Sequence, residues 1–147
     1  MGLLQSSKIE EVSCRETWAR LSADPSAVLV DVRTQSEWAF VGLADLTAIG
    51  KQPVLLEWSS FPTSRVDPQF VEKLDAALKE RGVGRDHEVL FLCRSGGRSR
   101  MAAEAMVAAG YTRCRNVAEG FEGPLDESRH RGTRSGWKSA GLPWVQG

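Results

Sequence analysis

The chain has 147 residues, of which 41% are hydrophobic, and this suits one domain with a sizeable core. Its 19 basic and 19 acidic residues cancel, which argues against a dedicated nucleic-acid binder. The apolar runs are too short to cross a membrane, and the N-terminus has neither the basic start nor the long apolar segment of a secretory signal. Three widely spaced cysteines and two isolated histidines predict no disulfide framework and no metal site. We therefore expect a soluble, cytoplasmic protein with free thiols and no nucleic-acid or membrane partner.

Short strands and helices alternate in the first half of the chain. The expected elements are a brief edge strand opening near Lys8, a helix from Ser13, a buried strand over 27–33, and a short helix after Thr34 that Gly42 ends. Each helix begins with a capping box, Ser13 with Glu16 and Thr34 with Glu37.

The same alternation continues in the second half. Strands are expected over 53–58, 88–93 and 114–120, and helices over 67–82 and 98–110. Asp67 is the expected N-cap of the first helix, with Pro68 at its first position and Gly82 at its end. This order predicts an α/β domain with a largely parallel sheet, wrapped by a C-terminal segment that Trp137, Leu142 and Trp144 pin.

Ligands of parallel sheets bind at the carboxyl ends of the strands, where Cys93 is expected. The sequence Cys93-Arg-Ser-Gly-Gly-Arg-Ser then turns from strand to helix within a few residues. Glycines let such a turn curl, so that several N–H groups and the positive end of the helix face one point. These groups favour the thiolate of Cys93 and a bound anion. Arg94 and Arg98 add forked donors for an incoming oxyanion.

Three stretches resemble the single-domain rhodanese-like sulfurtransferases. They are LVDVRTQSEWAFVG at 29–42, VLFLCRSGGRSRMAAEAMVAAGY at 89–111 and NVAEGFEG at 116–123. The resemblance implies a rhodanese-like three-layer α/β fold, with a parallel five-stranded sheet and helices on both faces. It implies one domain over 1–147, with a core at about 8–123 and an extension at 124–147 packed on it.

The resemblance also implies the chemistry. Cys93 would take a sulfane sulfur from thiosulfate or a protein persulfide and pass it to cyanide or a thiol, without metal or organic cofactor. The backbone of Arg94, Ser95, Gly96, Gly97, Arg98 and Ser99 would line the sulfur pocket, with both arginines as candidates for the donor's anionic group. Asp31 and Arg33 are expected to support the loop, and Glu37 to hold Arg33 or to cap its own helix.

Two other functions remain open from the sequence. Cysteine phosphatases of the same fold use a similar cradle, but they place arginine six positions after cysteine and usually have histidine before it. Here Arg98 follows Cys93 by five positions and Leu92 precedes it, which makes a tighter loop suited to a sulfur atom. A rhodanese-like module that binds a partner or senses redox state, without turnover, is the other alternative. Cys114 as a resolving thiol for Cys93 is a minor one.

Overall fold

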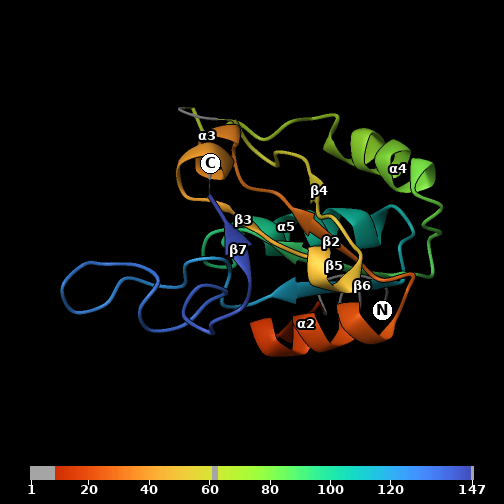
Figure 1. The fold of residues 1–147 in the computed structure, drawn as a ribbon. Coiled ribbons are helices and arrows are strands. Elements are labelled where there is room, and N and C mark those ends of the chain that lie inside the picture. Colours follow the sequence, from red (N-terminus) through yellow and green to blue (C-terminus); the bar gives the residue numbers. More distant parts are fainter. Residues whose placement is uncertain (1–8, 61–62, 147) are drawn as a thin grey trace.

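The computed structural model describes residues 9–60 and 63–146, and its centre is one parallel sheet (Figure 1). The predicted edge strand opens near Lys8, which lies outside the described residues, but its remainder is present. The five strands lie in the order β1-β6-β5-β2-β4, and all four neighbouring pairs are parallel. Their bounds are β1 Glu10–Val12, β2 Val28–Asp31, β4 Val54–Leu55, β5 Glu88–Leu92 and β6 Arg113–Val117. The predicted parallel α/β sheet is confirmed.

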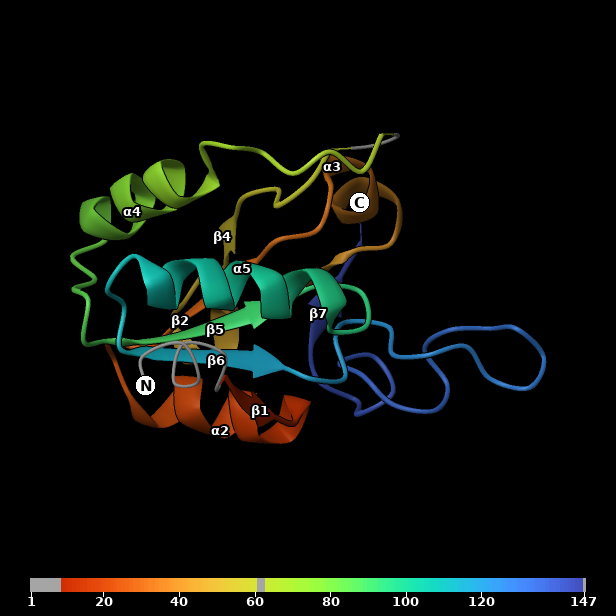
Figure 2. The ribbon, with the colours of Figure 1, turned by 180° about the vertical axis from the view of Figure 1, so that it is seen from behind.

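Helices cover both faces of this sheet, as Figures 1 and 2 show. The helices are α2 Cys14–Ala23, α3 Gln35–Phe40, α4 Phe70–Glu80 and α5 Gly97–Ala108, with a 3-10 turn η1 at Thr47–Ile49. Alternate residues of the strands point to opposite faces. Val30 and Phe91 pack in the core under α4 and α5, whereas Leu29 and Leu90 pack in the core under α2. The rhodanese-like three-layer arrangement is therefore present.

The capping boxes predicted for α2 and α3 are both formed. The start predicted for α4 is wrong, because the helix begins at Phe70 and not at Pro68. The Asp67 carboxylate accepts the N–H of Gln69 at 2.9 Å and the ammonium of Lys73 at 2.7 Å. These bonds hold residues 67–69 in a turn that precedes the helix.

The C-terminal segment packs against the sheet and adds a strand pair that the sequence analysis did not predict. β7 (Trp144–Val145) runs antiparallel to β3 (Leu43–Ala44), which follows α3. Trp137 is fully buried in the core that α2 covers, and its indole N–H donates to the carbonyl of Pro143 at 2.7 Å. In the part of the chain that the structure describes, no helix is long and apolar enough to cross a membrane.

Candidate active site

Cys93 lies immediately after β5, at the carboxyl end of the central strand, and α5 begins four residues later. Gly96 makes this short turn possible. Its φ of +107° is in the left-handed region, and a Cβ there would lie 2.4 Å from the carbonyl oxygen of Ala118. A side chain at this position would therefore strain the backbone and collide with the segment after β6.

The sulfur of Cys93 is buried within hydrogen-bond donors. The N–H of Gly96 donates to it at 3.1 Å, and the hydroxyl oxygen of Ser99 lies 3.2 Å away. The N–H groups of Ser95, Gly97, Arg98 and Ser99 have no acceptor among residues 9–60 and 63–146. A depression of about 520 Å³ opens over the sulfur, lined by Cys93, Arg94, Ser95, Gly97, Arg98 and Met101. The loop thus brings together the residues that the sequence predicted, with donors left for an anion.

The two arginines of the loop differ in what they contact. Arg98 forms a forked pair with Glu37, with nitrogen-to-oxygen distances of 2.7 and 3.0 Å. Partial burial opposes ionisation of Glu37, but hydrogen bonds from Arg98 and Thr34 lower its pKa to about 2. Arg94 is exposed and has no ion-pair partner in the described part of the chain. Arg94 is therefore the loop cation whose charge is not already neutralised.

Glu37 has one of its two expected roles. It closes the capping box of α3, accepting the N–H and hydroxyl of Thr34 at 3.1 Å each, but it holds Arg98 and not Arg33. Arg33 instead pairs with Asp31 at 2.7 Å, and both side chains are buried. The correction has a simple reason, since Arg33 follows Asp31 by two residues and its side chain folds back onto that carboxylate.

The Asp31–Arg33 pair reaches the loop through Phe121. The guanidinium carbon of Arg33 lies 4.3 Å from the centroid of the Phe121 ring, and the Phe121 N–H donates to the carbonyl of Cys93 at 2.8 Å. A second guanidinium bond, from Arg33 to the Gly42 carbonyl at 2.8 Å, ties the pair to the start of β3. The pair therefore stabilises the segments that support the loop, and it does not line the depression over the sulfur.

The sequence analysis missed Asn116, which stands on β6 and contacts both Ser99 and the Gly96 carbonyl. It also missed the need for Gly120, where a Cβ would lie 2.3 Å from the Arg94 carbonyl oxygen. Both residues belong to the NVAEG stretch that carried part of the family resemblance. A buried asparagine in a strand was the available signal, because such a side chain needs polar partners.

The other two cysteines do not line the depression over the Cys93 sulfur. Cys14 is buried, and its thiol donates to the Gly120 carbonyl at 3.4 Å. Burial, with the nearby Glu119 carboxylate, raises the pKa of Cys14, and burial raises that of Cys114 to about 12. None of the three cysteines forms a disulfide.

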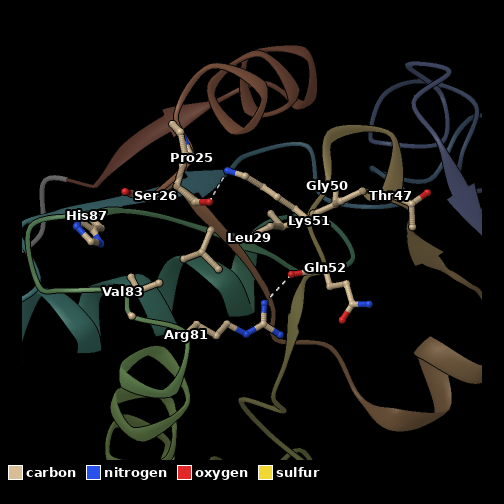
Figure 3. Close-up of a pocket in the computed structure, with 14 residues that line it drawn as sticks. Pro25, Ser26, Leu29, Thr47, Gly50, Lys51, Gln52, Arg81, Val83 and His87 are labelled. Atoms are coloured by element: carbon tan, nitrogen blue, oxygen red, sulfur yellow. Dashed lines mark hydrogen bonds between the residues drawn. The ribbon is translucent and has the colours of Figure 1, made fainter.

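A larger pocket, of about 680 Å³, lies at the end of the sheet opposite to Cys93, around the amino end of β2 (Figure 3). The lysine and the arginine that line it, Lys51 and Arg81, donate hydrogen bonds to backbone carbonyl groups. Lys51 donates to Asp24 at 2.6 Å and Ala27 at 2.7 Å, and Arg81 donates to Gln52 at 2.7 Å. This pocket contains no residue of the Cys93 loop.

Known proteins share both the sequence and this arrangement. A family model described as the STR4 middle domain matches residues 9–147. Thiosulfate sulfurtransferase 18 of Arabidopsis thaliana is 34% identical over 129 residues, which cover 86% of this chain and 88% of that protein. The chain belongs to the rhodanese-like sulfurtransferase family.

Two bacterial proteins are similar over nearly the whole chain. The crystal structure of Rv0390 from M. tuberculosis superimposes with a TM-score of 0.81 at 43% identity, covering 94% of this chain and 98% of that one. The uncharacterized protein RP600 of Rickettsia prowazekii is 32% identical over 136 residues, which cover 92% of this chain and 97% of that protein. The fold described above is thus the fold of a solved relative.

Proposed function

We propose that the protein is a sulfurtransferase in which Cys93 carries a sulfane sulfur as a persulfide. One observation carries the proposal. The Cys93 sulfur accepts the Gly96 N–H at 3.1 Å, in a loop whose remaining N–H groups have no acceptor among the described residues. Such a cradle stabilises a thiolate and then the negative outer sulfur of a persulfide. Membership of the rhodanese-like family supports the same reaction.

The reaction divides into two displacements. In the first, the Cys93 thiolate attacks the outer sulfur of thiosulfate, a new S–S bond forms, and the original S–S bond breaks. Sulfite leaves with the electron pair of that bond, and the persulfide keeps the negative charge. In the second, cyanide or a thiolate attacks the outer sulfur, and the Cys93 thiolate leaves. No proton transfer and no external oxidant or reductant is needed when the acceptor is cyanide.

Arg94 is the side chain we expect to meet the donor's sulfonate group. It lines the depression over the sulfur, it is exposed, and its charge is not neutralised by a carboxylate of the described residues. Arg98 lines the same depression but is paired with Glu37, so its contribution to donor binding is expected to be smaller. A protein persulfide would meet the same two side chains.

We further propose that residues 1–147 act as one unit in the cytoplasm. The C-terminal segment completes a core through Trp137, and a reactive thiol is maintained in a reducing compartment. The sulfur acceptor in the cell is expected to be a thiol, because cyanide serves as an acceptor chiefly in assays.

Intact mass spectrometry tests the proposal. Incubation with thiosulfate is expected to add one sulfur atom to the wild-type protein, and cyanide is expected to remove it as thiocyanate. Cys93→Ser should show neither change, while Cys114→Ser, a matched substitution at a buried cysteine outside the loop, should show both.

Two results would overturn sulfur transfer. Hydrolysis of an aryl phosphate without persulfide formation would favour a cysteine phosphatase of the same fold. Absence of persulfide, thiocyanate and phosphate release would favour a binding or redox-sensing module.

A further inference from the structure

The hydroxyl group of Ser99 lies between three acceptors but has one proton. Its oxygen is 2.5 Å from Oδ1 of Asn116, 3.2 Å from the Cys93 sulfur and 3.2 Å from the Gly96 carbonyl oxygen. Ser99, Asn116 and Cys93 are each at most 2% exposed, so water does not readily replace a missing partner. Whichever acceptor takes the proton leaves the others without it.

The neighbours of Asn116 fix the orientation of its amide. Its nitrogen, Nδ2, donates to the Glu11 carboxylate at 2.8 Å and to the Gly96 carbonyl at 3.1 Å. Turning the amide over would aim Oδ1 at these two acceptors, with no proton between them. Oδ1 therefore faces Ser99 and accepts a hydrogen bond from its hydroxyl group, at the shortest of the three distances.

We propose that Asn116 is a positioning residue that competes with the Cys93 sulfur for the single proton of Ser99, and thereby sets how much thiolate Cys93 holds. When Ser99 donates to Asn116, its lone pairs face the sulfur, which suits a thiol S–H. When Ser99 turns to the sulfur, its proton stabilises the thiolate. Asn116 does not line the depression over the sulfur, and its amide bonds to Ser99, Glu11 and the Gly96 carbonyl, so it acts through Ser99.

This competition matters because the sulfur changes character during the proposed reaction, on which the inference rests. In that reaction the attacking form of Cys93 is the thiolate, and the same atom is the neutral inner sulfur while the persulfide exists. If the Ser99 hydroxyl always donated to the sulfur, this hydrogen bond would favour the thiolate throughout and would weaken the nucleophilicity of that thiolate. Asn116 gives the Ser99 proton a second acceptor, so that neither state is held too strongly.

Several charged groups also lie around the cluster of Cys93, Ser99 and Asn116, and all of them remain in the variants used below. They are Arg94 and Arg98 on its own loop, Glu37 on α3, Asp31 and Arg33 at the end of β2, and Glu11 on β1 with Arg100 on α5. A change in the alkylation rate of Cys93 that depends on Ser99 can therefore be separated from the electrostatic effect of these charged groups.

A double-mutant cycle measures the competition. The readout is the rate at which iodoacetamide alkylates Cys93, followed by peptide mass mapping from about pH 5 to about pH 9, because the thiolate is the reacting form. Asn116→Ala is expected to accelerate alkylation about tenfold near pH 6. This factor corresponds to the lower end of the free energy that a hydrogen bond to a charged acceptor contributes. In the Ser99→Ala background, the same substitution should not accelerate it. Burial raises the pKa of Cys14 and of Cys114, so these two thiols should react more slowly, and the peptide map distinguishes them from Cys93.

Arg115→Ala is the matched control, since it removes the next polar side chain on β6, which pairs with Glu10 and Glu88 away from Ser99. Its alkylation rate should stay within about twofold of the wild-type rate. Slower alkylation of Asn116→Ala, or an equal acceleration with and without Ser99, would overturn the inference. Equal acceleration would mean that the substitution only loosens the loop.

A measurement on the wild-type protein covers the case in which Asn116→Ala does not fold. The side-chain carbonyl carbon of Asn116 should shift in NMR spectra as Cys93 ionises, because the Ser99 proton then leaves Oδ1. This shift should be largely lost in Ser99→Ala, and its persistence there would contradict the competition. Neither readout requires sulfur transfer. If the variants show the expected alkylation rates but the protein releases no thiocyanate, the proposed function is overturned and this inference stands. If the protein releases thiocyanate but the alkylation rates do not depend on Ser99 as expected, this inference is overturned and the proposed function stands.

Discussion

Apart from a substitution of Cys93, Glu37→Gln is the most informative single substitution, because it tests the charge pair with Arg98. Glutamine keeps the length of the side chain and the capping-box geometry of α3, but it removes the charge opposite Arg98. The pair is forked and partly buried, with side chains 23% and 19% exposed for Arg98 and Glu37. The substitution therefore isolates the charge from the shape.

The magnitude follows from the pKa of Glu37, which the hydrogen bonds of Arg98 and Thr34 lower from 4.5 to about 2, against the effect of burial. At about 1.4 kcal/mol per pH unit this difference corresponds to about 3 kcal/mol. Solvent at the exposed fifth of the side chain screens the pair, so we expect a loss of about 2 kcal/mol in unfolding free energy at pH 7.

The pH dependence gives the sharper test. A carboxylate whose pKa is lowered in the folded state stabilises the protein fully above its ordinary value, and this stability is lost as the pH falls through 4.5 towards about 2. The difference in unfolding free energy between wild type and Glu37→Gln should therefore be largest above about pH 5 and less than about half as large by pH 3.

Urea unfolding followed by tryptophan fluorescence at several pH values measures this difference. Glu72→Gln is the matched control, because Glu72 is exposed in the first turn of α4 and forms no ion pair in the described part of the chain. It should change the unfolding free energy by less than about 0.5 kcal/mol at every pH. A wild-type minus Glu37→Gln difference that stays constant from pH 7 to pH 3 would refute the reasoning.

Three further outcomes are expected. Arg94→Ala should raise the KM for thiosulfate about tenfold while shifting the urea midpoint little; equal losses in activity and stability would contradict its assignment. Gly96→Ala should lower the unfolding free energy by about 2 kcal/mol or more and abolish persulfide formation, since its Cβ would meet the Ala118 carbonyl. Trp137→Ala should cost about 3–5 kcal/mol and expose the C-terminal segment to limited proteolysis; an unchanged cleavage pattern would show that Trp137 does not anchor that segment.

Local patterns were enough to predict most of the fold. The buried runs of β2 and β5 and the capping boxes at Ser13 and Thr34 depend on neighbours in the sequence, and the structure contains each of them. The prediction failed at the start of α4, where the side chain of Asp67 bonds into a turn instead of capping the helix. It also missed the β3–β7 pair, whose two strands are about a hundred residues apart and too short to be recognised separately.

The loop after Cys93 was determined by the sequence itself, because a strand, two glycines and a helix start within seven residues leave the backbone few other paths. The partners of its side chains were not. Only the tertiary structure pairs Arg98 with Glu37, 61 residues earlier in the chain, and leaves Arg94 without a carboxylate in the described residues. Only the packing of β6 beside β5 brings Asn116 to Ser99. A short segment sets its own backbone, but the competition for one buried proton depends on groups that folding brings together.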